Sequence, residues 1–164
     1  MIRSFINWRG PLYLLALVFL ASCQSIDLYE KTADIPGHAW KSDYKPSFSF
    51  TIKDTVAPYQ IYLTLRHDDK YSFNNIYVNV HTLQPGDDTA NTIRQDLRLA
   101  SDEKGWSYSG IGMDDIWDHS LALTPTNRYF YFRKPGTYTF TIEQIMRQDP
   151  LEHVYNVGLR LIKK

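Results

Sequence analysis

The chain has 164 residues, 18 basic and 18 acidic side chains, and a single cysteine, Cys23. Residues 1–22 contain two arginines and no acid, so 16 basic and 18 acidic residues follow them, without the basic excess that is typical of nucleic-acid-binding proteins. One cysteine excludes an intrachain disulfide, and the roughly 142 residues from Cys23 onward are a usual size for one domain stabilised by its core.

The first 22 residues have the pattern of a secretory signal peptide. Arg3 and Arg9 precede an apolar run over 12–20, and the small residues Ala21 and Ser22 stand directly before Cys23. About ten apolar residues span roughly 15 Å as a helix, whereas a bilayer core needs about 30 Å, so the sequence predicts a cleaved segment rather than a transmembrane helix.

The cleavage site resembles the lipobox of bacterial lipoproteins, in which the new first residue is a cysteine that carries a diacylglycerol on its sulfur. We therefore predict that Cys23 is lipidated and that two or three acyl chains anchor the protein permanently in a membrane. An ordinary signal-peptidase site with a coincidental cysteine is the alternative.

Residues 23–46 show no clear period and contain Pro36-Gly37 and Pro46, so they are predicted to form a lipidated tether and a lead-in segment. Trp40 is expected to dock on the domain that follows. That domain is predicted to span 47–164.

From Ser47 onward apolar residues recur at every second position, which is the period of half-buried strands. The predicted strands cover 47–53, 60–66, 76–80, 92–99, 121–123, 128–133, 137–142 and 154–162. Strands 128–133 and 137–142 are expected to form a hairpin across Pro135-Gly136, and Tyr138 has the place of a tyrosine corner.

One short helix is predicted at 143–148, where Glu143 and Arg147 stand at i,i+4 spacing. The predicted fold class is therefore all-β, an antiparallel β-sandwich of immunoglobulin-like or jelly-roll type with one short helix. A closed barrel is the alternative.

Residues 100–120 have no clean period and contain an acidic cluster at Asp114, Asp115 and Asp118. The cluster lacks calcium-loop spacing, so loop capping is favoured over metal binding and no metal or cofactor is predicted. The five histidines are scattered and are interpreted as surface or interface residues. Asp118, His119 and Ser120 carry the letters of a catalytic triad, but sequence neighbours point to different faces, so no enzyme is predicted.

Aromatic residues in and beside the same stretch allow two further interpretations. Trp106, Tyr108 and Trp117 suit stacking on sugar rings, which makes a glycan-binding sandwich the alternative function. Asp115, Trp117 and Asp118 together suit a protein-docking patch, because an aromatic anchor among polar groups carries much of the energy of an interface. A third interpretation places Trp117 as a buried plug at one end of the sandwich.

A set of motifs occurs at residues 135–144, 146–151 and 156–160, at Asp115-Ile-Trp-Asp118, and at the Cys23 lipobox with residues 35–40. Together these motifs resemble the gliding motility lipoprotein GldH family of Bacteroidetes.

The resemblance implies a non-enzymatic outer-membrane lipoprotein that serves gliding and the type IX secretion machinery, with other cell-envelope proteins as partners. It brings no catalytic residues. Gln24 differs from the aspartate that retains lipoproteins in the inner membrane, and no acidic run follows Cys23, so the periplasmic face of the outer membrane is expected.

Overall fold

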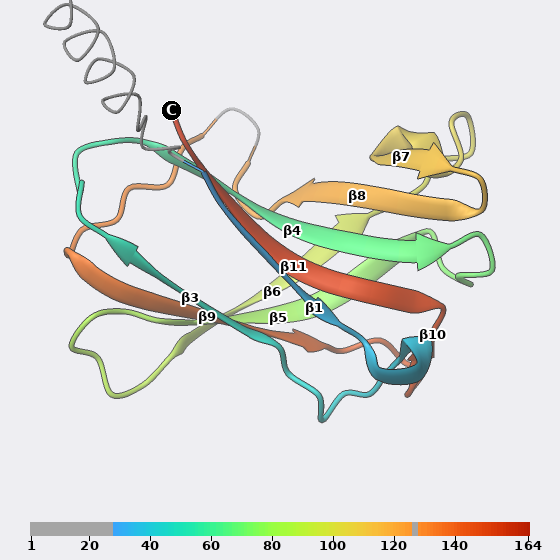
Figure 1. The fold of residues 1–164 in the computed structure, drawn as a ribbon, viewed down its shortest axis with the longest axis horizontal. Coiled ribbons are helices and arrows are strands. Elements are labelled where there is room, and N and C mark those ends of the chain that lie inside the picture. The colour runs from blue at the N-terminus through green and yellow to red at the C-terminus, as the bar shows by residue number, and fades with distance from the viewer. Residues whose placement is uncertain (1–27, 126–127) are drawn as a thin grey trace, which may run out of the picture.

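Two antiparallel β-sheets face each other in the computed structural model, which describes residues 28–125 and 128–164 (Figure 1). The first sheet has the order β1 (Leu28–Asp34), β11 (Val154–Lys163), β4 (Tyr59–Asp68), β8 (Ile116–Ala122) and β7 (Gly110–Met113). The second has the order β3 (Ser47–Ile52), β9 (Gly136–Gln144), β5 (Asn75–Leu83) and β6 (Asn91–Arg98). The short strands β2 (Ala39–Trp40) and β10 (Leu151–Glu152) pair with each other.

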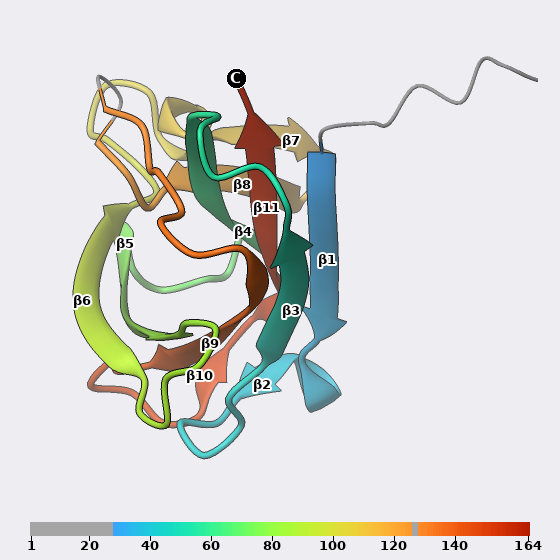
Figure 2. The same ribbon diagram turned by 90° about the vertical axis from the view of Figure 1, so that its left-hand side faces the viewer.

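The period-two pattern places the core between the two sheets. Phe48, Phe50 and Ile52 are buried on β3, and Val157, Leu159 and Leu161 are buried on β11. Alternate residues on β3 point outward and are exposed. The predicted antiparallel sandwich is confirmed, and Figure 2 shows the two layers from one end.

The predicted lead-in segment belongs to the sandwich from Leu28 onward. β1 pairs with β11 along its whole length, from Leu28 opposite Ile162 to Asp34 opposite Asn156. Trp40 is fully buried and donates its indole N–H to the Tyr44 carbonyl at 2.8 Å, which confirms that it docks on the domain. The signal peptide, Cys23 and the first residues of the tether lie outside the described residues.

The predicted hairpin of 128–133 with 137–142 is wrong. β9 pairs with β3 on one side and with β5 on the other, so neither of its edges is open to another strand. Residues 128–133 instead cross one end of the sandwich, where Phe130 forms a single antiparallel bridge with Tyr59.

The predicted helix at 143–148 is also wrong. Glu143 and Gln144 extend β9, and the Ile145 N–H continues the ladder by donating to the Tyr77 carbonyl at 3.0 Å. The Gln144 side chain is buried, donates to the Trp40 carbonyl and accepts from the Met146 N–H. Pairing with β5 satisfies the backbone groups that a helical turn would have paired locally. Among the described residues, the only helical turns are the 3-10 turns η2 (Pro36–His38) and η3 (Trp106–Tyr108).

Residues 100–120 have no clean period in the sequence, and no strand was predicted there, yet they contain β7 and most of β8. Gly110 and Gly112 give β7 no side chains with which to show alternation, and β8 buries the polar His119 where an apolar residue is expected. The period of these two strands is therefore hidden in the sequence. No helix among the described residues is both long and apolar enough to cross a bilayer.

Candidate functional site

The three residues of the predicted docking patch lie at the β7–β8 hairpin. Asp115 is in the turn, where its carbonyl accepts a hydrogen bond from the Asp69 N–H at 2.9 Å. Trp117 and Asp118 are strand residues of β8, opposite His67 and Arg66 of β4. Two of the three residues are therefore paired within the sheet, although residues 100–120 show no clean period in the sequence.

Consecutive strand residues point to opposite faces, so Trp117 and Asp118 cannot share one contact surface. Trp117 is on the inward side and is half-buried against Gly112, where an added Cβ would lie 2.7 Å from a ring carbon. Asp118 is on the outer face, where it binds the Arg66 guanidinium through both oxygens at 2.7 Å. That bidentate bond raises the pKa of Arg66.

A groove of about 320 Å³ runs over the outer face of the five-stranded sheet. Thr32 and Thr64, which line it, are the two register partners of Gly158 on β11. A Cβ on Gly158 would lie 2.6 Å from the Lys31 carbonyl oxygen. A side chain at position 158 would therefore collide with the neighbouring strand.

Charged side chains line both sides of the groove. Arg66 and Asp118 form one ion pair, and Arg160 with Glu30 forms a second, at 3.4 Å. The buried Thr64 hydroxyl has no hydrogen-bond partner within the described part of the chain. The groove is thus polar, with at least one donor group unused.

The rim of this groove at β7 is apolar. Ile111 is 82% exposed and Met113 is 78% exposed, and the register with Asp118 and Ile116 places both on the outer face. β7 is the last strand of its sheet, visible at the upper right of Figure 1. Exposed apolar side chains on an edge strand are features of a protein-binding surface. We call Ile111, Met113 and the groove residues Arg66 and Asp118 the β7 edge surface.

Two histidines that were interpreted as surface residues are buried in the core. His67 Nε2 and His119 Nε2 are 2.9 Å apart, and their rings are stacked. The Ser109 hydroxyl is 2.8 Å from His119 Nδ1 and also donates to the Leu99 carbonyl. Burial, with the neighbouring His67, lowers the pKa of His119 to about 4. The sequence alone could not predict this cluster, because Ser109 is 10 residues and His67 is 52 residues from His119.

The residues of the other sequence hypotheses are not gathered into one site. Trp106 packs its ring edge-on against His67 inside the domain, and exposed Tyr108 lies under the Arg98 guanidinium. Asp118 and Ser120 are exposed, whereas His119 between them is buried. Among the described residues, no group of three or more His, Cys, Asp or Glu side chains is placed to hold a metal ion.

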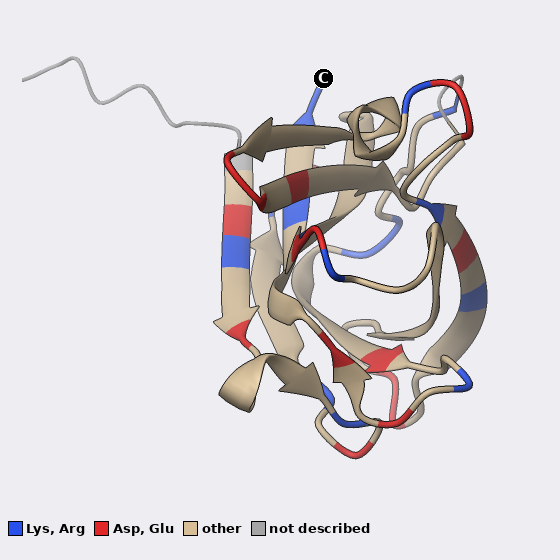
Figure 3. Cartoon of the chain, turned by 90° about the vertical axis from the view of Figure 1, so that its right-hand side faces the viewer, with Lys and Arg blue, Asp and Glu red and all other residues tan. Residues whose placement is uncertain are grey.

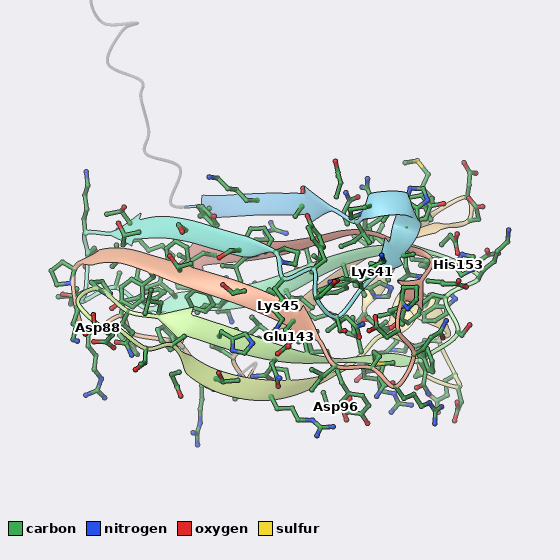
Figure 4. All side chains as sticks on the ribbon, turned by 90° about the horizontal axis from the view of Figure 1, so that it is seen from below. Lys41, Lys45, Asp88, Asp96, Glu143 and His153 are labelled. Atoms are coloured by element: carbon green, nitrogen blue, oxygen red, sulfur yellow. The ribbon has the colours of Figure 1, made fainter. Side chains whose placement is uncertain are left out.

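A second polar cluster lies on the outer face of the four-stranded sheet, around Glu143 (Figure 4). Glu143 binds Lys45 at 2.6 Å and also accepts hydrogen bonds from Asn79 and His81. These partners lower the pKa of Glu143 to about 2. Every member contacts another member, so the cluster ties β9 to β5 and to the segment before β3.

The chain is similar to known proteins over most of its length. The family model of the GldH lipoprotein matches residues 27–161. A gliding motility lipoprotein GldH homolog of Christiangramia forsetii is 22% identical over 160 residues, which covers 93% of each chain. The gliding motility lipoprotein GldH of Flavobacterium johnsoniae is 25% identical over 164 residues, which covers 95% of this chain and 97% of the relative.

Among solved structures, the VP2 subviral particle of infectious bursal disease virus matches 84% of this chain and 31% of its own, at 16% identity and a TM-score of 0.30, too low for any comparison of function. The family match, in contrast, covers almost the whole described fold. It begins one residue before β1 and ends within β11, so it includes both sheets. The chain therefore belongs to the GldH lipoprotein family, as its motifs predicted.

Proposed function

We propose that this protein is a non-enzymatic scaffold or assembly component of the gliding motility and type IX secretion apparatus, anchored by lipid at Cys23 to the periplasmic face of the outer membrane. Both relatives are named as gliding motility lipoproteins. The family supports membrane attachment and a place among the proteins of this machinery in general terms.

The β7 edge surface is the observation that carries the docking role. Ile111 and Met113 expose nearly their whole side chains on an edge strand, and the Arg66–Asp118 ion pair is beside them. An apolar centre with a polar rim is the usual anatomy of a protein interface. The free edge of β7 also offers backbone N–H and C=O groups to an added strand of a partner.

The sequence patch of Asp115, Trp117 and Asp118 enters this proposal in altered form. Asp118 belongs to the β7 edge surface through its pair with Arg66, and Asp115 is at the tip of the same hairpin. Trp117 supports the hairpin from the inward side by packing on Gly112. We assign partner contact to the outer face and a structural role to the Trp117 ring.

A photo-crosslinking residue at position 111, in cells that carry this protein, tests the docking role. We expect a covalent adduct with another envelope protein. With the crosslinker still at position 111, Met113→Asp should reduce or abolish the adduct. The double variant Ile111→Asp with Met113→Asp, which carries no crosslinker, should impair secretion or gliding, while its melting temperature stays near that of the wild type because both positions are exposed.

The matched control is Ile93→Asp, an isoleucine that is 51% exposed on β6, one of the two edge strands of the other sheet. It should leave secretion unchanged. Normal secretion in the double variant, with no adduct at position 111, would reject the β7 edge surface as the docking site. Cys23→Ser tests the anchor separately: it should abolish metabolic labelling with a palmitate analogue and release the protein from the membrane fraction.

A further inference from the structure

A second exposed apolar surface lies at the opposite end of the sandwich from the β7–β8 turn, on residues 128–133. Tyr129 is 49% exposed and Tyr131 is 54% exposed, and Phe130 between them is also accessible. Arg128 and Arg133 flank these rings and are exposed. We call residues 128–133 the aromatic end segment.

The exposed rings are held on an ordered backbone. Phe130 and Tyr59 exchange two backbone hydrogen bonds, of 2.8 and 2.9 Å. Phe132 is buried and packs against Phe50, Tyr59 and Tyr138, with ring centroids 4.6 to 5.7 Å apart. The segment is therefore fixed by one inward ring while its neighbours Tyr129 and Tyr131 face solvent.

The aromatic end segment lies at the same end of the molecule as the start of β1. Ring contacts connect them in three steps: Tyr29 to Phe50, Phe50 to Phe132, and Phe132 to Phe130. Figure 2 looks at this end, with the start of β1 and the chain that leads into β9 both toward the viewer.

The distance to the proposed lipid is short. Cys23 precedes Leu28 by five residues, and five residues span at most about 18 Å. A lipid on Cys23 therefore keeps this end of the sandwich close to the bilayer surface. This step rests on the lipid anchor of the proposed function.

Charge is distributed unequally between the two ends. At the aromatic end, Asp54 and Asp87 are paired with Lys163 and Lys134, and the two arginines of the segment face outward together with one exposed acid, Asp88. The opposite end, which Figure 3 faces, carries Asp114 and Asp115 in the β7–β8 turn, and Asp69 and Lys70, which follow β4. In Figure 4, His153 and Lys41 mark that opposite end, far from Asp88.

We propose that the aromatic end segment rests on the bilayer that holds the lipid anchor. Tyr129 and Tyr131 enter the headgroup region, and Arg128 and Arg133 contact lipid phosphates. Amphipathic aromatic rings and basic side chains are the residues that favour this interface, and anionic lipids attract basic ones. The sandwich then stands end-on, and the β7–β8 turn points away from the membrane.

The full lipidated chain, reconstituted in vesicles of phosphatidylethanolamine and phosphatidylglycerol, tests this orientation. The thioether on Cys23 blocks the only natural cysteine, so a nitroxide can be placed specifically at Tyr131→Cys or, as a control, at Ile111→Cys. We expect the label at 131 to collide several-fold more with lipid-soluble oxygen than with a water-soluble nickel chelate. The label at 111 should show the reverse.

Charge reversal supplies a second variant. Arg128→Glu with Arg133→Glu should return the label at 131 toward aqueous accessibility in vesicles that contain phosphatidylglycerol. A label at 131 that stays aqueous while the protein floats with the vesicles would overturn the proposal. Shielding of that label from both reagents would also overturn it, because it would indicate a second copy of the chain on this surface. If Cys23 carries no lipid, the protein will not float with the vesicles and its free thiol will react with the nitroxide reagent. That outcome would contradict the lipid anchor of the proposed function, and it is distinct from a failure of the orientation proposed here.

Discussion

His67 and His119 show how two polar rings are kept in an apolar core. His67 Nδ1 is 2.6 Å from the Asp68 carbonyl, which accepts only, so this nitrogen carries the proton and Nε2 is left as an acceptor. His119 then donates from Nε2, and its Nδ1 lies 2.8 Å from the Ser109 hydroxyl, whose single proton is shared with the Leu99 carbonyl. Both rings are neutral in this arrangement.

We predict that stability falls as pH falls from about 6.5 to 4. Burial lowers the pKa of both histidines, that of His119 to about 4, so the unfolded chain takes up protons that the folded chain does not. The free energy of unfolding should drop by about 2 kcal/mol between pH 7.5 and 5. Urea unfolding at a series of pH values measures it.

The variant His119→Gln should flatten this decline, whereas His38→Gln, at an exposed histidine, should retain it. Glu143 does not interfere, because its lowered pKa, about 2, costs stability only as pH falls from its ordinary value of 4.5 toward 2. A wild-type stability that is constant from pH 7.5 to 5 would contradict the neutral pair.

At the scale of the element, β9 is the strand on which the four-stranded sheet is built. It pairs with β3 and β5, and its inward residues Tyr138, Phe140 and Ile142 are all buried. The Tyr138 hydroxyl donates to the Lys134 carbonyl at 2.9 Å and accepts from the Lys134 N–H at 3.2 Å. The predicted tyrosine corner is thus confirmed, and it fixes the chain where it turns into β9.

Tyr138→Phe should lower the free energy of unfolding by about 1 to 2 kcal/mol, because it leaves two backbone groups of Lys134 without their partner in a partly buried turn. The measurement is the midpoint of urea unfolding. Tyr62→Phe is the control, since its hydroxyl contacts only the Gln60 side chain, and it should shift the midpoint little. Equal shifts in the two variants would show that the corner adds no stability.

At the scale of the whole molecule, the segment 28–46 holds the two sheets together. β1 completes the five-stranded sheet, Trp40 fills the core, and Pro46 accepts a hydrogen bond from Ile142 of β9 directly before β3 begins. Ser42 is bound to the Asp149 carboxylate through its backbone N–H and its hydroxyl. The described chain is therefore part of the fold from its first strand onward.

We predict that Trp40→Ala lowers the free energy of unfolding by about 3 to 5 kcal/mol, because it removes a fully buried ring and leaves a cavity. Trp117→Ala is the matched control, since its ring is half-buried and its site is open to solvent. The loss there should be clearly smaller. Chemical denaturation of both variants decides, and a larger loss for Trp117 would restore its interpretation as a core plug.

The sequence by itself determined the strands whose inward residues are apolar. Phe48, Phe50 and Ile52 alternate with polar residues, and such a pattern has one low-energy solution, a strand with one face buried. The family could also be predicted from the sequence, because its motifs are short segments that can be recognised without knowing which residues they contact in the fold. Trp40 was likewise predictable, because a large apolar ring gains most from burial.

Only the tertiary structure decided which segments pair and which side chains meet. Residues 143–148 have helical spacing, but the open edge of β5 offered hydrogen bonds at longer range. Trp117 and Asp118 lie on opposite faces because they are consecutive residues of a paired strand. His67 contacts His119 only because β4 and β8 are neighbours in the sheet. Contacts between residues far apart in the chain are set by sheet order and register, and no local period encodes either.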